Sequence, residues 1–277
     1  MLSRAVDAVL ASSITVELWV VDNASDSRPE LPPSDNLQLI QNEQNLGFAA
    51  ANNQALARAR GDLILLLNPD CLVLPDTLER MLHALERYLE AGMAGCRILN
   101  EDGTEQRGCR RKLPTPESGF ARAFNIRRFS RSRAPGIDLN TQELPDQPVF
   151  VEAISGAFML VKREALEDVG PLDEDYFLHC EDLDWCKRFA DKGWKILFVP
   201  DVEVIHYQGS CSTEAPIRVS WHKHAGMAKY YAKFLQHDQS PALNLLVYAG
   251  IYTRFLALAA LAGLKKLLPS KSHAAKS

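Results

Sequence analysis

Residues 62–70 of the chain read Asp-Leu-Ile-Leu-Leu-Leu-Asn-Pro-Asp, and this stretch decides the fold class. The apolar part of Asp62–Leu67 consists only of Leu and Ile, which is typical of a strand buried on both faces of a sheet. The Asn-Pro-Asp that follows predicts that the strand ends there. A second apolar run, Val16–Val21, is followed in the same way by Asp22. The sequence therefore predicts two buried strands that each lead to an acidic residue.

Helical patterns alternate with these strands. Apolar residues in Met1–Ala11 repeat at the spacing of one helix face, and Gly61 stands where a glycine often ends a helix. The other expected helices are Phe48–Arg60, Pro75 to Gly92 and Lys162–Val169, and the other expected strands are Leu37–Ile40 and Phe158–Val161. The alternation predicts an α/β fold with a mainly parallel sheet flanked by helices.

The composition limits the class of protein. The chain has 277 residues, of which 47% are hydrophobic and 24% charged, which suits a globular protein and excludes a disordered or low-complexity chain. The net charge of −4 argues against a nucleic-acid partner. Residues 107–133 nevertheless hold nine Lys or Arg and one acidic residue, Glu117. This segment is either a solvated basic loop or a site for substrate phosphates or anionic lipid.

The cysteines indicate a cellular compartment. Six are present without a Cys-x-x-Cys pair, at positions 71, 96, 109, 180, 186 and 211. Met1–Ser13 does not have the pattern of a signal peptide. We therefore expect free thiols in a reducing cytoplasm.

The acidic residues after the strands predict a site. In α/β sheets, ligands bind beyond the carboxyl ends of the strands. Asp22-Asn23 and Asn68-Pro69-Asp70 both follow a predicted strand, so we expect them at one edge of the sheet. Either aspartate could instead cap the next turn or helix.

The second half of the chain carries another acidic group. Glu181, Asp182 and Asp184 fall in the first turn of a predicted helix that ends near Lys192. Acids in a first turn favour the helix dipole, but three in four residues exceed that need, and one could act as a general base.

Two short paired strands are expected next, at Lys195–Val199 and Val202–Ile205. The second strand would deliver His206 at its end. Whether this histidine is structural or a metal ligand is left open by the sequence.

Six motifs in order resemble the family 2 glycosyltransferases, with the closest likeness to the rhamnosyltransferase-like branch. The resemblance covers residues 1–215, which we expect to form a domain of the GT-A fold, a Rossmann-like sheet flanked by helices. The motifs are Asp22-Asn23-Ala24-Ser25, Asn45-Leu46-Gly47-Phe48-Ala49 with Asn52-Asn53, Asn68-Pro69-Asp70, Ser155-Gly156-Ala157, Glu181-Asp182-Leu183-Asp184-Trp185 and Val204-Ile205-His206.

The resemblance implies roles for individual residues. Asp182 is similar to the catalytic base of the family, with Glu181 beside it. Asp70 would hold Mg²⁺ or Mn²⁺ on the donor diphosphate, and His206 resembles a further metal ligand. The residues implied in nucleotide and sugar binding are Asp22, Asn23, Asn45, Gly47, Asn53 and Asn68.

The function implied is that of an inverting, metal-dependent glycosyltransferase of cell-surface polysaccharide synthesis. It would move a sugar, with rhamnose the first expectation, from a nucleoside-diphosphate sugar to a glycan or a polyprenyl-diphosphate-linked acceptor. Two alternatives stay open at this point. A nucleotidyltransferase also places acids around a metal and a nucleotide, and a non-catalytic sugar-nucleotide-binding protein would use the same pocket.

One departure from the family concerns the N-terminus. Members normally begin with an apolar strand and then a helix, and Met1–Ala11 resembles that helix. The first strand is missing, so core strands are expected to lack a pairing partner. The sequence is therefore expected to start upstream of Met1 or to be shortened.

The C-terminal part, residues 216–277, is expected to be a separate helical segment. Leu243–Leu264 is long enough to span a bilayer but carries Arg254 near its middle. A helix on the membrane surface, a core helix and a membrane span are the alternatives. Lys265, Lys266 and Lys271 would suit the anionic cytoplasmic face of the inner membrane, so we expect a cytoplasmic protein in peripheral contact with it.

Overall fold

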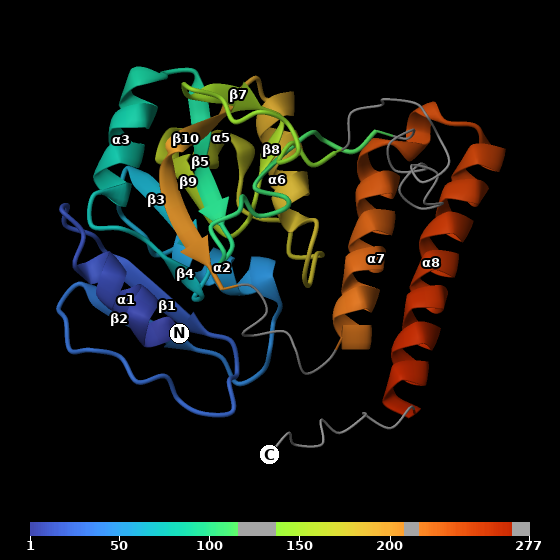
Figure 1. Ribbon diagram of the computed structural model, residues 1–277, viewed down its shortest axis with the longest axis horizontal. Coiled ribbons are helices and arrows are strands. Elements are labelled where there is room, and N and C mark those ends of the chain that lie inside the picture. Colours follow the sequence, from blue (N-terminus) through green and yellow to red (C-terminus); the bar gives the residue numbers. More distant parts are fainter. Residues whose placement is uncertain (116–136, 208–215, 268–277) are drawn as a thin grey trace, which may run out of the picture. The chain divides into compact units, whose positions relative to one another are not determined.

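The computed structural model describes residues 1–115, 137–207 and 216–267 (Figure 1). The described residues fall into two compact units. The first contains residues 1–114 and 137–207, and the second contains the C-terminal helices in residues 216–267. None of the five cysteines that the structure describes forms a disulfide.

The helices and strands alternate along the first unit. The helices are α1 (Leu2–Leu10), α2 (Phe48–Leu56), α3 (Thr77–Arg87), α5 (Arg163–Val169) and α6 (Glu181–Asp191), followed in the second unit by α7 (Pro216–Phe234), the 3-10 helix η2 (Gln236–Asp238) and α8 (Pro241–Leu267). The strands are β1 (Leu18–Asp22), β2 (Leu37–Gln41), β3 (Leu63–Leu67), β4 (Cys71–Leu72), β5 (Ala91–Leu99), β6 (Arg110–Arg111), β7 (Val149–Val151), β8 (Ala153–Ile154), β9 (Phe158–Lys162) and β10 (Lys195–His206).

A six-stranded sheet forms the centre of the first unit. Its strand order is β3-β9-β5-β10-β4, and β7 pairs with β10 beside this path. β5 and β10 run parallel, whereas β9, β4 and β7 pair with antiparallel neighbours. Helices cover the sheet: α3 contacts β5 and β10, and α5 and α6 contact β5, β9 and β8 (Figure 1). The predicted α/β class is confirmed.

Alternate residues of the central strands enter two separate apolar clusters. In β5, Ala94, Cys96 and Ile98 pack with Met81 of α3, whereas Met93 packs with the other cluster. That second cluster contains the fully buried Trp185, Cys186 and Phe189 of α6. Because the side chains of a strand alternate between its faces, both faces of the sheet are covered and α6 is held firmly against one of them.

β5 was not predicted from the sequence. Gly92 was expected to end a helix, but α3 ends at Arg87 and Gly92 is the second residue of β5. A Cβ at Gly92 would lie 2.8 Å from Ala165 Cβ, so this position needs a glycine for packing. The small residues of Ala91–Leu99 lack the β-branched pattern of a strand, and tertiary packing selects the extended form instead.

The expected pair of short strands at Lys195–Val199 and Val202–Ile205 is also wrong. The two segments form one continuous strand, β10, which runs parallel to β5 along its length. A register shift between Val199 and Glu203 accommodates Pro200 as a bulge, because proline cannot donate a ladder hydrogen bond. The strand therefore continues to His206, which lies opposite Cys71 of β4.

β1 and β2 form a separate parallel pair. Within the described residues, β1 pairs only with β2, and β3 pairs only with β9. Each of β1 and β3 therefore has one edge without a strand partner. The sequence predicted core strands without a pairing partner, and β1 and β3 agree with that expectation.

The second unit is a helical hairpin. Ala228 and Tyr231 of α7 pack against Val247 and Ile251 of α8. The Tyr231 hydroxyl donates to Asn244 Oδ1 at 2.6 Å. These contacts use one side of α8, while large apolar side chains on its other side are exposed.

Candidate active site

The first cluster of the site lies where β10 ends next to β4. Asp70 directly precedes β4, and His206 ends β10, so strand pairing brings the two side chains together. His206 Nε2 lies 3.1 Å from Asp70 Oδ1 and 3.3 Å from Asn68 Nδ2. Both side chains of the Asp70–His206 pair are only 8% exposed. The structure thus joins three residues that the sequence predicted from distant motifs.

Gln106 orients the His206 ring. Gln106 Oε1 lies 2.7 Å from His206 Nδ1. The Gln106 amide nitrogen already donates to Asn100 Oδ1 at 3.1 Å, so its oxygen is the acceptor and Nδ1 of the histidine is the donor. In the neutral ring this leaves the Nε2 lone pair directed at Asp70.

This donor set fits a divalent cation. A neutral imidazole nitrogen and a carboxylate oxygen are both acceptors, so a contact of 3.1 Å between them needs a proton or a metal ion between the atoms. A carboxylate with an imidazole is a ligand pair that Mn²⁺ accepts. Asp70, Cys71 and His206 place their ligand atoms within 4.8 Å of one another.

Cys71 does not complete this ligand set. Its thiol donates to the Ala157 carbonyl oxygen at 3.5 Å. Burial, and next the charge of Asp70, raise the pKa of the Cys71 thiol well above its usual range. Asp70 and His206 are therefore kept as the predicted ligands, and the hydrogen-bonded thiol of Cys71 stays outside the predicted set.

The second cluster lies at the start of α6. As predicted, Glu181, Asp182 and Asp184 occupy its first turn. Asp182 Oδ2 accepts from Arg111 Nη2 at 2.5 Å and from the Gly156 backbone N–H at 3.2 Å. Asp182 Oδ1 accepts from the Leu183 N–H at 2.8 Å. The carboxylate is therefore fixed in orientation.

The two adjacent acids have opposite pKa shifts. Burial alone would raise the pKa of Asp182, but the charge and hydrogen bond of Arg111 outweigh it and hold that pKa below its usual range. Burial, and next the charge of Asp182, raise the pKa of Glu181 to about 8. The charge of Arg111 therefore favours the ionised form of Asp182, and burial favours the protonated form of Glu181.

Residues 155–157 connect the two clusters. The Gly156 N–H donates to Asp182, and the carbonyl oxygen of the following residue, Ala157, accepts from the Asn68 N–H at 3.0 Å. A Cβ at Gly156 would lie 3.4 Å from Asp182 Cβ, which is ordinary contact but leaves no spare room. The predicted base and the predicted metal ligands are therefore linked through two consecutive residues.

The predicted nucleotide-binding asparagines make internal contacts. Asn23 Nδ2 donates to Asn45 Oδ1 at 3.0 Å, and Asn23 Oδ1 accepts from the Leu46 N–H at 3.0 Å. Gly47 has φ +89° and a Cβ there would lie 2.6 Å from the Phe177 carbonyl oxygen, so only glycine fits. These contacts shape the loop after β2, and a direct contact with a nucleotide stays a prediction.

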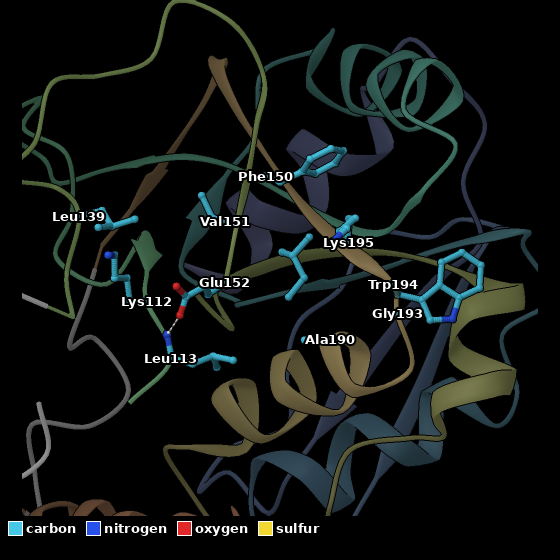
Figure 2. A pocket seen from close by; sticks show the side chains of 11 residues that line it. Lys112, Leu113, Leu139, Phe150, Val151, Glu152, Ala190, Gly193, Trp194 and Lys195 are labelled. Atoms are coloured by element: carbon cyan, nitrogen blue, oxygen red, sulfur yellow. Dashed lines mark hydrogen bonds between the residues drawn. The ribbon is translucent and has the colours of Figure 1, made fainter. Parts of the chain in front are cut away.

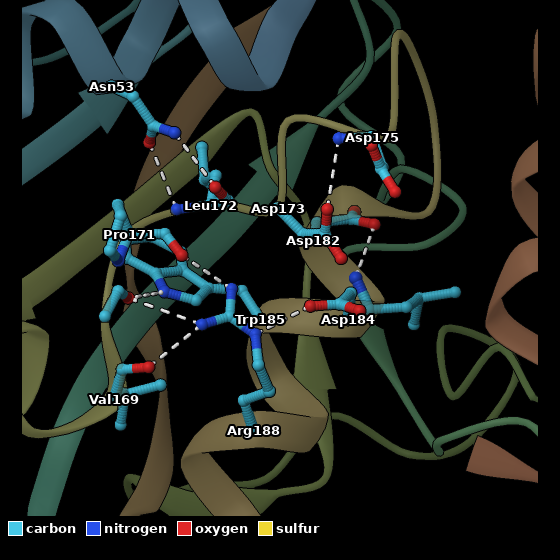
Figure 3. A network of polar contacts seen from close by, with 12 residues as sticks. Asn53, Val169, Pro171, Leu172, Asp173, Asp175, Asp182, Asp184, Trp185 and Arg188 are labelled. Carbon is cyan, nitrogen blue, oxygen red and sulfur yellow. Dashed lines mark hydrogen bonds and ion pairs between the residues drawn. The ribbon is translucent and has the colours of Figure 1, made fainter. Parts of the chain in front are cut away.

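Asn53 connects α2 to the loop before α6. Its side chain donates to the Leu172 carbonyl oxygen at 2.9 Å and accepts from the Leu172 N–H at 3.1 Å (Figure 3). On α6, Arg188 binds Asp184 at 2.7 Å and donates to the Pro171 carbonyl oxygen at 2.7 Å. Asp184 is fully buried and serves this structural network.

Asp22 is buried at the end of β1. Its Oδ1 accepts from the Ser25 N–H at 3.1 Å, which caps the turn that follows the strand. The capping role that the sequence left open is therefore real. Its role with a nucleobase stays a prediction.

Comparison with known proteins identifies the family. Residues 1–170, more than half of the chain, match the family described as glycosyl transferase family 2. The chain belongs to this family. It is a glycosyltransferase that uses a nucleotide-sugar donor in glycan biosynthesis, and the nucleotidyltransferase alternative is dropped.

Two curated relatives are similar to this glycosyltransferase. The N-acetylglucosaminyl-diphospho-decaprenol L-rhamnosyltransferase of Mycobacterium tuberculosis is 26% identical over 235 residues, which cover 75% of this chain and 71% of the relative. The rhamnosyltransferase WbbL of Escherichia coli K12 is 28% identical over 172 residues, covering 58% and 61% of the two chains.

Solved structures confirm the GT-A fold. The mannosyltransferase PcManGT of Pyrobaculum calidifontis, in complex with GDP-Man and Mn²⁺, aligns with a TM-score of 0.52 at 16% identity and covers 95% of this chain and 76% of its own. TarS 1–349 of S. aureus aligns with the same TM-score at 14% identity, covering 95% and 69%. At these identities the likeness concerns the fold alone.

Sequence reasoning missed three residues of the glycosyltransferase site. Gln106, Arg111 and Gly156 contact His206 or Asp182 but received no individual role. Arg111 was counted only as part of the basic segment 107–133. Within the described part of that segment, Arg107 pairs with Asp138, Arg110 with Glu105 and Arg111 with Asp182. These three arginines form ion pairs with acidic residues of the protein itself. Residues 116–136 of the segment lie outside the described part.

A cavity of about 360 Å³ lies near β7 and the end of α6 (Figure 2). Its walls are mainly apolar, with Phe150, Val151 and Trp194, and it also has Lys112 and Lys195. Glu152 at its edge accepts from the Leu113 N–H at 2.8 Å. None of the predicted catalytic or metal-binding residues lines this cavity, so the predicted site of transfer stays at the two clusters linked by residues 155–157.

Proposed function

We propose that this glycosyltransferase transfers rhamnose, with inversion, from a nucleoside-diphosphate sugar to an acceptor linked to polyprenyl diphosphate. The single observation that carries the chemistry is the hydrogen-bonded connection of Asp182 to the Asp70–His206 pair through residues 155–157. The names of the two curated relatives support the sugar, and that of the mycobacterial relative supports the lipid-linked acceptor.

Asp182 acts as the general base in this proposal. It takes the proton of the acceptor hydroxyl while that oxygen forms a bond to the anomeric carbon. The bond from the anomeric carbon to the diphosphate oxygen breaks, and its electron pair leaves with the nucleoside diphosphate. One displacement from the side opposite the leaving group inverts the anomeric carbon.

Asp70 and His206 hold the divalent cation. Bound there, the cation supplies Lewis-acid stabilisation of the charge on the leaving diphosphate. Gln106 fixes the His206 ring so that Nε2 faces this position. The PcManGT complex contains Mn²⁺ together with GDP-Man, which supports this ion for a protein of the same fold.

The proposal also includes contact with a membrane surface. Among the described residues, Pro241–Gly263 of α8 is long and apolar enough to cross a bilayer, and only 17% of its apolar window is buried. Its exposed face carries large apolar side chains, namely Leu245, Leu246, Tyr252, Leu256, Leu258 and Leu261. The core-helix alternative is thereby disfavoured, and α8 is proposed to lie on the cytoplasmic leaflet.

Two polar groups of α8 are compatible with this placement. The Thr253 hydroxyl donates to the Ala249 carbonyl oxygen of its own helix at 2.6 Å, so it needs no water. Arg254 is half-buried, and its charge lowers the pKa of His224 on α7, though less than burial does. The arginine is therefore near α7, and residues 241–263 contain no other Lys, Arg, Asp or Glu.

The function is tested with the purified protein and a panel of nucleotide sugars. We expect dTDP-rhamnose with Mn²⁺ to raise the melting temperature, since a ligand at a hundredfold its Kd stabilises by about 2.7 kcal/mol. Transfer is then followed by mass spectrometry on a synthetic N-acetylglucosaminyl polyprenyl diphosphate. If stabilisation and transfer occur only with a different nucleotide sugar, that sugar replaces rhamnose in the proposal. If no donor gives either stabilisation or transfer, the proposed transfer is refuted.

Membrane contact is tested separately by flotation with vesicles that contain phosphatidylglycerol. The variant Leu256→Gln should float less than the wild type because Leu256 is 63% exposed on α8. Leu89→Gln is the matched control, since Leu89 is 75% exposed in the first unit. Equal flotation of the two variants would contradict the assignment of α8.

A further inference from the structure

Arg111 lies against the catalytic base at a place that the sequence motifs do not mark. β6 (Arg110–Arg111) pairs with β8, and this pairing presents the Arg111 side chain to α6. Arg111 Nη2 donates to Asp182 Oδ2 at 2.5 Å and to the Ile154 carbonyl oxygen at 2.5 Å. The side chains of Arg111 and Asp182 are only 14% and 15% exposed. The guanidinium is thus held by β8 in a fixed position beside the base.

The carboxyl group next to Asp182 has the opposite surroundings. Glu181 is 6% exposed, and its Oε2 has no hydrogen-bond partner among the described residues. Two adjacent buried carboxylates are not both ionised at low cost, because desolvation and mutual repulsion add. One of the pair is therefore expected to keep a proton at neutral pH.

We propose that Arg111 is the positioning residue that determines which of these two carboxyl groups is ionised. It keeps Asp182 ionised, so that Asp182 can take the proton of the acceptor hydroxyl group. Glu181 keeps its own carboxyl proton. This proposal rests on the proposed function, because it assigns the role of base to Asp182.

The other groups near Asp182 do not compete with Arg111. Arg110 is turned away, since it pairs with Glu105 at 2.8 Å and lies over the Phe198 ring. On α6 the nearest thiols are those of Cys180 and Cys186, and burial raises the pKa of Cys186 above its usual range. Arg111 is therefore the cation within hydrogen-bond distance of Asp182 in the described part of the chain.

The first test measures kcat against pH for Arg111→Gln and Arg111→Lys. Without the guanidinium, the pH at which kcat rises on the acid side of the profile should increase by about one to two units. Activity should therefore recover as the pH is raised. Lysine retains the positive charge, so the acid limb of Arg111→Lys should lie close to the wild-type pH. A limb that stays at the wild-type pH in Arg111→Gln would overturn the proposal.

Arg188→Gln is the matched structural control. Arg188 also binds a buried aspartate of α6, Asp184, at 2.7 Å, but this pair does not touch the base. Its loss should lower the melting temperature without moving the acid limb. An equal shift in Arg188→Gln and Arg111→Gln would show a general effect of destabilised α6 and would also contradict the assigned role.

Infrared spectroscopy tests the proton directly and does not need activity. The wild type at neutral pH should show the C=O band of a protonated carboxyl group that disappears in Glu181→Gln. In Arg111→Gln, the C=O band should come from Asp182 or from both Asp182 and Glu181. Absence of a Glu181 band in the wild type overturns the inference, whereas failure of sugar transfer with this band present overturns only the proposed function.

Discussion

The site contains two aspartates of low exposure whose partners differ. In the first pair, Asp70 Oδ1 lies 3.1 Å from the imidazole Nε2 of His206, whereas in the second pair Asp182 accepts from the guanidinium of Arg111, which is always charged. A carboxylate beside an imidazole is a suitable ligand pair for a metal ion, and a carboxylate beside a guanidinium is held in its ionised form. The comparison indicates that the different roles proposed for these two aspartates follow from their different partners.

The largest effect is expected from breaking the second pair at the base. Asp182→Asn keeps the shape of the side chain but cannot take a proton, so kcat should fall by about 10²–10⁴. Donor binding, measured by thermal shift, should be retained because the Asp70–His206 cluster is unchanged. Loss of both properties together would mean that Asp182 supports the fold or the donor and is not the base.

The first pair should respond in the opposite way. Asp70→Asn removes the anionic ligand, so the stabilisation by Mn²⁺ and the nucleotide sugar should disappear, and with it most of the transfer. Cys71→Ala is the matched control, since the thiol is hydrogen-bonded to Ala157 and is not assigned as a ligand. If Cys71→Ala loses the Mn²⁺ response as fully as Asp70→Asn, the proposed ligand set is wrong.

A smaller effect is expected when the orientation of His206 is released. Gln106→Leu removes the acceptor for His206 Nδ1 while leaving both proposed ligands in place. Loss of such an outer hydrogen bond typically lowers metal affinity about 10–100-fold. Titration with Mn²⁺, followed by the melting temperature, measures the change, and unaltered affinity would remove Gln106 from the metal-binding role.

The smallest effect concerns stability against pH. The pKa of Glu181 is raised to about 8 in the folded protein, so the folded state binds more protons than the unfolded state between the ordinary carboxyl pKa and that value. Stability should therefore fall as the pH rises through this window. Glu181→Gln cannot ionise, so its urea midpoint should exceed that of the wild type more at alkaline than at acidic pH. Parallel pH curves for the two proteins would contradict the raised pKa.

Local patterns predicted much of the fold. The apolar run before Asp70 forms β3 as expected, and the three acids begin α6 as expected. In both cases the signal lies in neighbouring residues, such as an apolar run with a polar end or carboxylates in a first turn. The local patterns placed Asp70, Asp182 and His206 at the ends of such elements, whereas their predicted roles as base and metal ligands came from the family resemblance.

The remaining features depend on contacts across the chain. Arg111 is separated from Asp182 by 71 positions, so no local pattern assigns their contact. β5 is rich in small residues and becomes a strand because α3, α5 and β10 surround it. The bulge at Pro200 likewise allows β10 to continue where the local sequence suggested a turn.

The link formed by Gly156 and Ala157 has a consequence for donor choice. The N–H that contacts the base and the carbonyl oxygen that contacts the Asn68 backbone belong to consecutive residues, whose Cα atoms are about 3.8 Å apart. Covalent geometry therefore limits how far the proposed base can separate from the proposed metal ligands. A change of donor sugar during evolution would then require changes in the side chains that surround the sugar ring. The distance between the proposed base and the proposed metal ligands would stay constant.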